Sequence, residues 1–357
     1  MTDPGRPRPR ARRASFFATC VPGLGRMLRR ELAESGGIEC TGTGFDGRAD
    51  IVFFEADRDG RAAALASRLA EDVFAESGRA SRTAAGSPAA IAAAAWPAGG
   101  VQRALSVWAD EVRPLARSMS FRVITRVLTE AGFLRTDLRQ AMTSAIGRDR
   151  PRWRTADPAQ LEVWICEWHD GQYVAGLRLS GAQLRQHGGR STELRGALRP
   201  TVAAAMVALA GPPARSGSVL LDPCCGSGTI LAEALAAGWT AEGADIDPAA
   251  VEAAGGNAPG ARVELGDARD LLLPDDSVAA CVSNLPFGRQ FAVQGDQASW
   301  TAAVLGEMSR VTRSGGSVVV LTPELPRQAI PGPLRLRKQV PVRLLGTDPS
   351  IWLFHRA

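Results

Sequence analysis

The pattern of apolar and polar positions predicts a small α+β unit at residues 16–100. Apolar runs at residues 16–20 and 49–56 predict strands, because each run is short and bounded by polar residues. Apolar residues at helical spacing predict one helix from Pro22 and a second over residues 62–76. We find no catalytic constellation in this unit.

The pattern at residues 101–184 predicts a second small α+β unit. Its expected elements are a helix at 101–107, a strand at 120–127, a helix at 135–148 and two strands at 160–168 and 172–180. The turn sequence His169-Asp170-Gly171 predicts that the last two strands form a hairpin. We expect Thr136 or Asp137 to cap the second helix.

The pattern changes after a polar, glycine-bearing linker at residues 185–199. From Pro200 onward, apolar strand-like runs alternate with helical patterns, which is typical of a doubly wound, mostly parallel sheet. The expected strands lie at residues 218–223, 240–247, 261–268, 278–285 and 316–322. We expect an antiparallel hairpin of residues 341–346 and 350–356 at one edge of this sheet.

Charge is distributed unevenly along the chain, although the net charge is only +5. Residues 1–15 carry five arginines and one aspartate, and we expect a disordered basic tail there. Residues 101–200 carry 16 basic and 10 acidic side chains, whereas residues 201–357 carry 12 and 15. The basic middle segment suits a polyanion such as nucleic acid, and a solvated surface is the alternative.

The remaining composition narrows the class of protein. No apolar run reaches the length of a membrane helix, and the N-terminus lacks the shape of a signal peptide. The six cysteines form no CxxC pair and histidines number only three, so we expect no metal site. Scattered cysteines are typical of free thiols in a reducing cytoplasm.

The sequence LLDPCCGSGTI predicts a ligand-binding turn between a strand and a helix. Gly226 and Gly228 permit unusual backbone angles and close approach of a ligand, and the following helix directs N–H groups toward it. The spacing D-x-x-x-G-x-G differs from the dinucleotide pattern G-x-G-x-x-G. Asp222, at the end of the strand, would repel a pyrophosphate but accept a hydrogen bond from an ammonium group.

Two further carboxylates end the next two predicted strands. Asp245 can accept hydrogen bonds from both ribose hydroxyls of a nucleoside, whereas Asp247 fits a helix cap better. Asp267 can accept one from an adenine amino group. Because the carboxyl ends of parallel strands carry the ligands in this fold, we expect Asp222, Asp245 and Asp267 at one edge.

The sequence SNLPFG follows the fourth strand at the same edge. The Asn284 side-chain carbonyl and the backbone carbonyl of Leu285 or Pro286 can accept both hydrogens of a planar amine, which directs the nitrogen lone pair toward an electrophile. Phe287 can stack on the base that carries the amine. Catalysis would rest mainly on positioning, because this clamp holds no carboxylate.

These motifs resemble those of class I S-adenosylmethionine-dependent methyltransferases. The loop from Asp222 to Gly228 is similar to their methionine-binding motif, and Asn284–Phe287 resembles the (N/D)PP(Y/F) motif of amino-group methyltransferases. Leu285 replaces the usual first proline, as in the THUMP-domain RNA guanine-N2 methyltransferases. The segments GFLRTDLRQAM and GRSTELRGALRP resemble THUMP and linker segments of that family, so the resemblance extends over residues 16–357.

The resemblance implies a domain order and a reaction. We expect a ferredoxin-like α+β unit at residues 16–100, a THUMP-like RNA-binding domain at 101–184, a linker at 185–199 and a Rossmann-like α/β methyltransferase domain at 200–357. The implied reaction transfers a methyl group from S-adenosyl-L-methionine to the exocyclic N2 amine of a guanosine in tRNA.

The resemblance also implies site residues. The implied catalytic residues are Asn284, Pro286 and Phe287. The implied cofactor-binding residues are Asp222, Pro223, Gly226, Gly228, Thr229, Asp245, Asp267, Ala268 and Asn284. Arg135 and Arg139 lie one helical turn apart and are expected to contact RNA phosphates, although ordinary solvated arginines remain an alternative.

The sequence leaves the identity of the amine open. A DNA adenine, ribosomal RNA or a protein glutamine presents a similar planar amine, and an inactive RNA-binding or chaperone protein is a further alternative. The basic segments favour nucleic acid over protein. Cysteine-dependent carbon methylation is disfavoured, because no cysteine follows the proline of the clamp. We expect a cytoplasmic monomer that binds tRNA and neither a membrane nor a metal.

Overall fold

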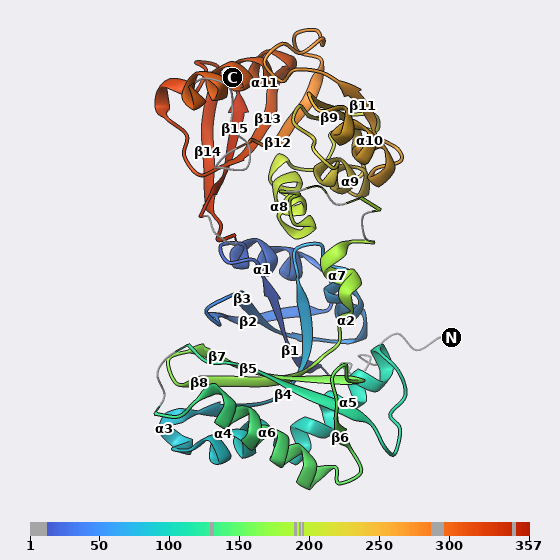
Figure 1. Cartoon of the computed structure of the whole chain (residues 1–357), viewed down its shortest axis with the longest axis vertical. Coiled ribbons are helices and arrows are strands. Elements are labelled where there is room, and N and C mark those ends of the chain that lie inside the picture. The colour runs from blue at the N-terminus through green and yellow to red at the C-terminus, as the bar shows by residue number, and fades with distance from the viewer. Residues whose placement is uncertain are drawn as a thin grey trace, which may run out of the picture. The chain divides into compact units, whose positions relative to one another are not determined.

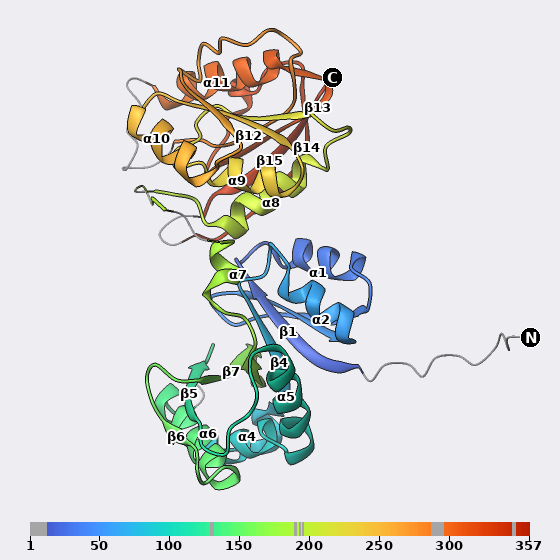
Figure 2. The ribbon, with the colours of Figure 1, turned by 90° about the vertical axis from the view of Figure 1, so that its right-hand side faces the viewer.

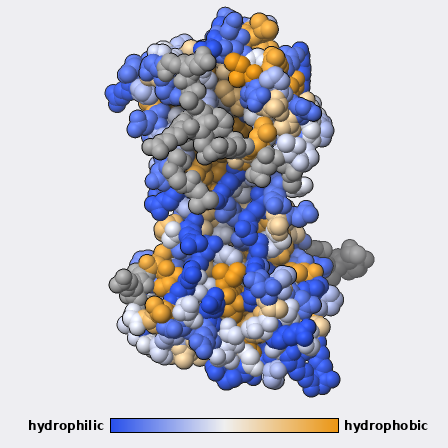
Figure 3. Space-filling view, viewed as in Figure 1, coloured by the Kyte–Doolittle hydropathy of each residue, from blue (hydrophilic) through white to orange (hydrophobic). Residues whose placement is uncertain are grey.

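The structure is a computed structural model that describes residues 13–128, 132–188, 191–192, 194, 196–286, 296–344 and 348–357. The chain divides into two compact units, Met1–Leu184 and Arg185–Ala357. Each unit is built around its own β-sheet (Figures 1 and 2). The face of the molecule in Figure 3 is mainly hydrophilic and carries separate apolar patches.

The first unit begins with a βαββαβ segment. Its elements are β1 (Ala14–Cys20), α1 (Gly25–Glu34), β2 (Ile38–Phe45), β3 (Asp50–Ala56), α2 (Arg58–Leu65) and β4 (Asp72–Ser81). The strand order β2-β3-β1-β4 is that of a ferredoxin-like sheet. Buried Leu28 and Leu32 lie on one face of α1, as the spacing predicts.

The helix that we expected at residues 62–76 is correct only over residues 62–65 and wrong over residues 66–76. Helix α2 ends at Leu65, and the buried Ser67 hydroxyl accepts hydrogen bonds from the N–H groups of Leu69 and Ala70, which turns the chain. Residues 72–81 then form β4, which pairs with β1 on one side and β8 on the other. Pairing in the sheet outweighs the local helical preference of this alanine- and glutamate-bearing segment.

The sheet of the first unit continues without a break beyond residue 100. The following elements are α3 (Arg82–Ala85), α4 (Pro88–Ala95), α5 (Ala98–Glu111), β5 (Ser120–Arg126), α6 (Arg135–Asp149), β6 (Arg154–Thr155), β7 (Leu161–His169), β8 (Gln172–Arg178) and α7 (Ala182–Gln186). Strands β7 and β8 form the predicted antiparallel hairpin. Helix α6 begins at Arg135, and the Asp137 carboxylate accepts a hydrogen bond from the Leu134 N–H (2.8 Å), so neither Thr136 nor Asp137 is the N-cap residue.

The second unit is the predicted doubly wound α/β fold. Its elements are α8 (Pro200–Ala210), β9 (Val219–Asp222), α9 (Thr229–Ala236), β10 (Thr240–Asp245), α10 (Pro248–Asn257), β11 (Arg262–Leu265), β12 (Val278–Asn284), α11 (Gln297–Val311), β13 (Thr312–Thr322), the 3-10 turn η1 (Arg327–Ala329), β14 (Leu334–Pro341) and β15 (Ser350–Arg356). The strand order is β11-β10-β9-β12-β13-β15-β14. Strands β9 to β13 are parallel, and β15 is antiparallel to both neighbours.

One strand of the terminal hairpin lies elsewhere than expected. The partner of β15 is β14 at Leu334–Pro341, whereas the sequence pattern placed it at residues 341–346. Arg335 to Gln339 are all exposed, so this edge strand lacks the alternation that marks a half-buried strand. The hydrophobic pattern alone therefore missed it.

Candidate active site

The loop after β9 provides the backbone geometry of a ligand-binding turn. Gly226 and Gly228 have φ angles of 50° and 79°, in the left-handed region that favours glycine. A Cβ atom on Gly228 would lie 2.9 Å from the Cα atom of Ala254, so a side chain does not fit there. Helix α9 starts at Thr229, so the N-terminal end of this helix lies at the turn.

Asp222 ends β9 as a buried carboxylate, with Pro223 buried beside it. Its Oδ1 atom accepts hydrogen bonds from the Ser283 hydroxyl (2.7 Å) and from the Cys224 N–H (3.2 Å). Burial raises the pKa of Asp222 to about 7, although both hydrogen bonds lower it, and the nearby Asp245 charge raises it further. A cationic group next to this carboxylate would favour its ionised form.

Asp245 ends β10 and supports the same loop. One carboxylate oxygen accepts a hydrogen bond from the Gly226 N–H (2.8 Å), and the other accepts one from the Asp247 N–H (3.0 Å). Each oxygen retains acceptor capacity for a hydroxyl group, because a carboxylate offers about four lone-pair sites. Asp247 caps α10 by accepting a hydrogen bond from the Ala249 N–H (2.9 Å), as the sequence predicts.

Asp267 lies beyond β11, and its carboxylate already has a charged partner. Its carboxylate forms an ion pair with the Arg269 guanidinium (2.6 Å), which holds the pKa of Asp267 below its usual range. Ala268, next to it, is buried. Asp267 therefore has fewer free lone pairs for an adenine amino group than the sequence suggested, and its role in cofactor binding remains a proposal.

The end of β12 presents an acceptor without a partner. Among the described residues, no hydrogen-bond donor reaches the Asn284 Oδ1 atom, although this atom is buried. An unsatisfied buried carbonyl is costly, so such a group usually serves a ligand. The Pro286 carbonyl accepts a hydrogen bond from the side-chain amide of Gln297 (3.1 Å) and retains a second lone pair. Phe287 lies outside the described residues.

Leu285 has a structural role in this motif. Its N–H donates a hydrogen bond to the Leu321 carbonyl (3.2 Å), which a proline in this position could not do. Its side chain is buried in the core cluster beneath the sheet edge. The departure from the commoner proline thus adds one more hydrogen bond between β12 and β13 before the chain reaches Pro286.

The cysteines near the site are protonated thiols. Burial raises the pKa of Cys224 and Cys225 above the usual range, and it raises the pKa of Cys281 to about 12. A thiol that keeps its proton is a poor nucleophile. This environment agrees with the expectation that no cysteine carries the reaction.

Sequence reasoning missed three residues of this site. Ser283 binds Asp222, Gln297 binds the Pro286 carbonyl, and Ile246 is 68% exposed directly after Asp245. An exposed isoleucine directly after a strand-ending acid was a signal in the sequence, whereas the partners of Ser283 and Gln297 depend on tertiary structure.

The predicted RNA-binding residues lie in the first unit. Arg135 and Arg139 are exposed on α6, each three positions before a buried residue, Leu138 and Met142 respectively, so they lie next to the buried stripe of the helix. Arg139 lines a groove of about 700 Å³ between α6 and β5, together with Arg122. Arg122 is neutralised there by Asp157 and Glu162, so α6 supplies the uncompensated charge.

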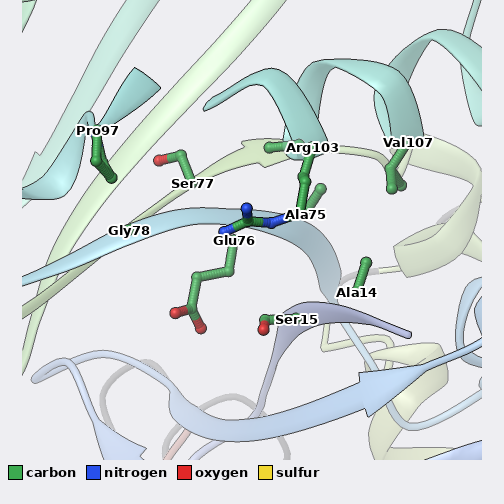
Figure 4. A pocket seen from close by; sticks show the side chains of 10 residues that line it. Ala14, Ser15, Ala75, Glu76, Ser77, Gly78, Pro97, Arg103 and Val107 are labelled. Carbon is green, nitrogen blue, oxygen red and sulfur yellow. The ribbon is translucent and has the colours of Figure 1, made fainter. Parts of the chain in front are cut away.

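A second pocket in the first unit does not resemble an active site. It lies between β1, β4 and α5 and has a volume of about 140 Å³ (Figure 4). Typical ligand sites are larger, about 300 to 1,000 Å³. Its acid, Glu76, is held by two hydrogen bonds from Arg79 at 2.9 Å.

Neither a metal cluster nor a membrane helix is found in the described parts of the chain. No three His, Cys, Asp or Glu side chains among the described residues are placed to hold a metal ion. No helix in the described ranges combines the length and the apolar character that crossing a membrane requires.

Comparison with known proteins identifies the second unit. Residues 187–328 match the family model described as UPF0020, RMKL-like, methyltransferase domain. The U6 snRNA (guanine-N(2))-methyltransferase THUMPD2 of Mus musculus is 40% identical over 136 residues, which are 36% of this chain and 24% of that protein. The tRNA (guanine(10)-N2)-dimethyltransferase of Methanothermobacter thermautotrophicus is 38% identical over 107 residues, which are 29% of this chain and 31% of that protein.

A solved structure shares the fold of both units. TrmN of Thermus thermophilus aligns with a TM-score of 0.75 and 24% identity, over 97% of this chain and 100% of that chain. The chain spans only about a quarter to a third of the length of the two curated relatives. The sequence match is confined to part of the chain: residues 187–328 are similar to the RMKL-like family of methyltransferase domains.

Proposed function

We propose that this protein transfers a methyl group from S-adenosylmethionine to the N2 amine of a guanosine in RNA, with tRNA as the expected substrate. The observation that carries the proposal is the buried, unpartnered Asn284 Oδ1 at the end of β12 in a methyltransferase domain. The two relatives above are named as guanine-N2 methyltransferases of U6 snRNA and tRNA. Guanine N2 is a planar exocyclic amine of the kind that the clamp fits.

The residues at the sheet edge fit the proposed cofactor. Asp222 offers a carboxylate to the ammonium group, Asp245 offers its remaining lone pairs to ribose hydroxyls, and the turn at Gly226 and Gly228 leads into the N-terminus of α9. Pro223, Thr229, Asp267 and Ala268 complete the proposed cofactor site. When bound, S-adenosylmethionine supplies an electrophilic methyl group on a positively charged sulfur.

The clamp would act on the amine by position. Asn284 Oδ1 and the Pro286 carbonyl accept the two amine hydrogens, which localises the nitrogen lone pair and directs it out of the hydrogen-bond plane. The side-chain amide of Gln297 already donates to the Pro286 carbonyl, so this oxygen has one remaining lone pair to offer a planar –NH₂ group. Phe287 is proposed to stack on the base. The proton that the amine loses passes to solvent, because the clamp itself holds no carboxylate.

Residues 101–184 are proposed to contribute an RNA-binding surface through Arg135 and Arg139. Both guanidinium groups are exposed on α6 beside the groove along β5. The six cysteines are free thiols in the structure, which supports the cytoplasm as the proposed compartment.

Incubation with methyl-labelled S-adenosylmethionine and unmodified total tRNA, followed by nucleoside mass spectrometry, tests the proposal. The expected product is N2-methylguanosine, and Asn284→Ala should slow its formation by on the order of 100-fold or more. Label in adenosine, cytidine or protein would contradict the guanine assignment. Binding of S-adenosylhomocysteine without any methyl transfer to RNA would instead favour an inactive RNA-binding protein.

A further inference from the structure

Basic residues in the second unit, Arg185–Ala357, are concentrated in two stretches of the chain, residues 185–199 and 325–347. Residues 325–347 contain five basic residues, Arg327, Arg335, Arg337, Lys338 and Arg343, and no acidic residue. The rest of residues 201–357 contains seven basic and fifteen acidic residues. The rest of residues 201–357 is acidic on balance, so the stretch at residues 325–347 is the part of residues 201–357 suited to contact phosphates.

Strand β14 presents three of these cations at the sheet edge, where a register shift between Leu336 and Lys338 interrupts the regular alternation of side chains. Arg335, Arg337 and Lys338 are exposed, together with Leu336 and Gln339 between and beside them. We call Arg335, Arg337 and Lys338 the β14 strip. Within the described residues, none of the three forms an ion pair with a carboxylate, and Arg335 donates only to the Gly332 carbonyl. Their charges are therefore available to a partner.

The register of the sheet relates the β14 strip to the amine clamp. Asn284 pairs with Leu321, Leu321 with Ile351, and Ile351 with Val340, so these four residues form one row across β12, β13, β15 and β14. Three strand spacings of about 4.8 Å separate Asn284 from Val340, or roughly 14 Å. Lys338 lies two residues before Val340 on β14, which places the strip within a few nucleotides of a base held at Asn284.

We propose that the β14 strip binds the phosphate backbone of the RNA that flanks the target nucleotide. The proposal rests on RNA being the substrate, as proposed above, and adds a contact surface in the catalytic unit itself. Exposed arginine and lysine side chains are suited to phosphates, and such contacts position a nucleic acid without reading its sequence.

An edge strand can also carry charge for another reason. Lysine and other charged residues on an exposed edge prevent pairing with a second chain. If the charges of the β14 strip only prevent pairing with a second chain, their removal should leave the RNA affinity unchanged. If they bind phosphates, their removal should lower both the RNA affinity and its dependence on salt. The two explanations therefore differ in a measurable quantity.

The test compares the triple variant Arg335→Gln/Arg337→Gln/Lys338→Gln with the wild-type chain. Affinity for unmodified total tRNA is measured by fluorescence anisotropy between 0.05 and about 0.3 M KCl, a range over which phosphate contacts are salt-sensitive. We expect the slope of log affinity against log salt to fall by about 2 to 3, and the affinity at low salt to fall by at least about tenfold. Affinity for S-adenosylhomocysteine should not change.

Arg215→Gln is a control for the loss of a single positive charge elsewhere in the second unit. Arg215 is exposed and precedes β9, at the opposite end of the strand from Asp222, so its removal should leave the slope unchanged. The proposal would be overturned if the triple variant kept the wild-type slope of log affinity against log salt. It would also be overturned if the variant aggregated but kept the wild-type affinity for RNA. If the wild-type chain binds tRNA but does not methylate it, the proposed reaction is wrong. The salt dependence of tRNA affinity, measured by anisotropy, would still show whether the β14 strip binds RNA.

Discussion

The Ser283 hydroxyl donates a hydrogen bond of 2.7 Å to the Asp222 carboxylate, and both groups are buried. Asp222 ends β9 and belongs to the proposed cofactor site, whereas Ser283 immediately precedes the amine clamp on the neighbouring strand β12. This hydrogen bond therefore links the proposed cofactor site to the proposed amine clamp. It also opposes the effect of burial, because a donor to a carboxylate favours the ionised form.

Replacement of Ser283 should change the pH dependence of cofactor binding. Burial raises the pKa of Asp222 to about 7, so ionisation of this carboxyl group, and with it the affinity for an ammonium group, should increase as pH rises through about 7. Ser283→Ala removes a donor and raises this pKa further. Affinity for S-adenosylhomocysteine, measured by calorimetry, should therefore fall by roughly fivefold at pH 7 and recover at higher pH.

Ser283→Thr is the control for this prediction, because threonine keeps the hydroxyl group. It should retain a pH profile close to that of the wild type. Calorimetry in two buffers of different ionisation enthalpy should also show proton release on binding near pH 7. A pH-independent loss of affinity in Ser283→Ala would mean that Ser283 only packs in the sheet and does not tune Asp222.

Asn284→Ala should reduce methyl transfer through the turnover number. The substitution removes one of the two proposed acceptors for the amine, and loss of one positioned hydrogen-bonding group costs on the order of 100-fold or more in rate. Steady-state kinetics at saturating cofactor and RNA checks this. If Asn284→Ala raised only the KM for the cofactor and left the turnover number unchanged, Asn284 would bind the cofactor and would not hold the amine.

The parallel strands and their ends could be predicted from the sequence, because each buried strand is a continuous apolar run that stops at a polar residue. Asp222, Asp245 and Asn284 were identified in this way, and the structure places all three at strand ends of one sheet. Strand β14 and the pairing of Ser283 with Asp222 could not be predicted. The first has no buried face, and the second joins residues 61 positions apart.

The helix predicted over residues 62–76 shows a different limit. Alanine-rich composition and helical spacing favour a helix locally, but Phe74 packs in the sheet core against Phe17, with ring centroids 4.5 Å apart. That contact links segments distant in sequence. Local propensity is a weak prior where such packing competes with it.

Gly228→Ala should destabilise the second unit more than Gly226→Ala. Both glycines have positive φ, but a Cβ atom on Gly228 would meet backbone and side-chain atoms of Ala254 within 3.0 Å, whereas a Cβ atom on Gly226 meets nothing within 4 Å. We expect a cost of about 1 kcal/mol for Gly226→Ala from the backbone alone, and about 2 to 4 kcal/mol for Gly228→Ala. Urea unfolding with separate probes for the two units measures both, and equal costs would contradict the close contact with α10.

Neutralisation of Arg135 and Arg139 should weaken RNA binding without affecting the cofactor. Both side chains are exposed on α6, and Arg139 lines the groove along β5. If each contacts a phosphate, Arg135→Gln/Arg139→Gln should lower the slope of log affinity against log salt by about 1 to 2. Arg26→Gln/Arg29→Gln, which removes two exposed arginines from α1, controls for net charge. If the two double variants lower the slope equally, the arginines of α6 act only through the overall charge of the chain, and the groove beside them is not the RNA site.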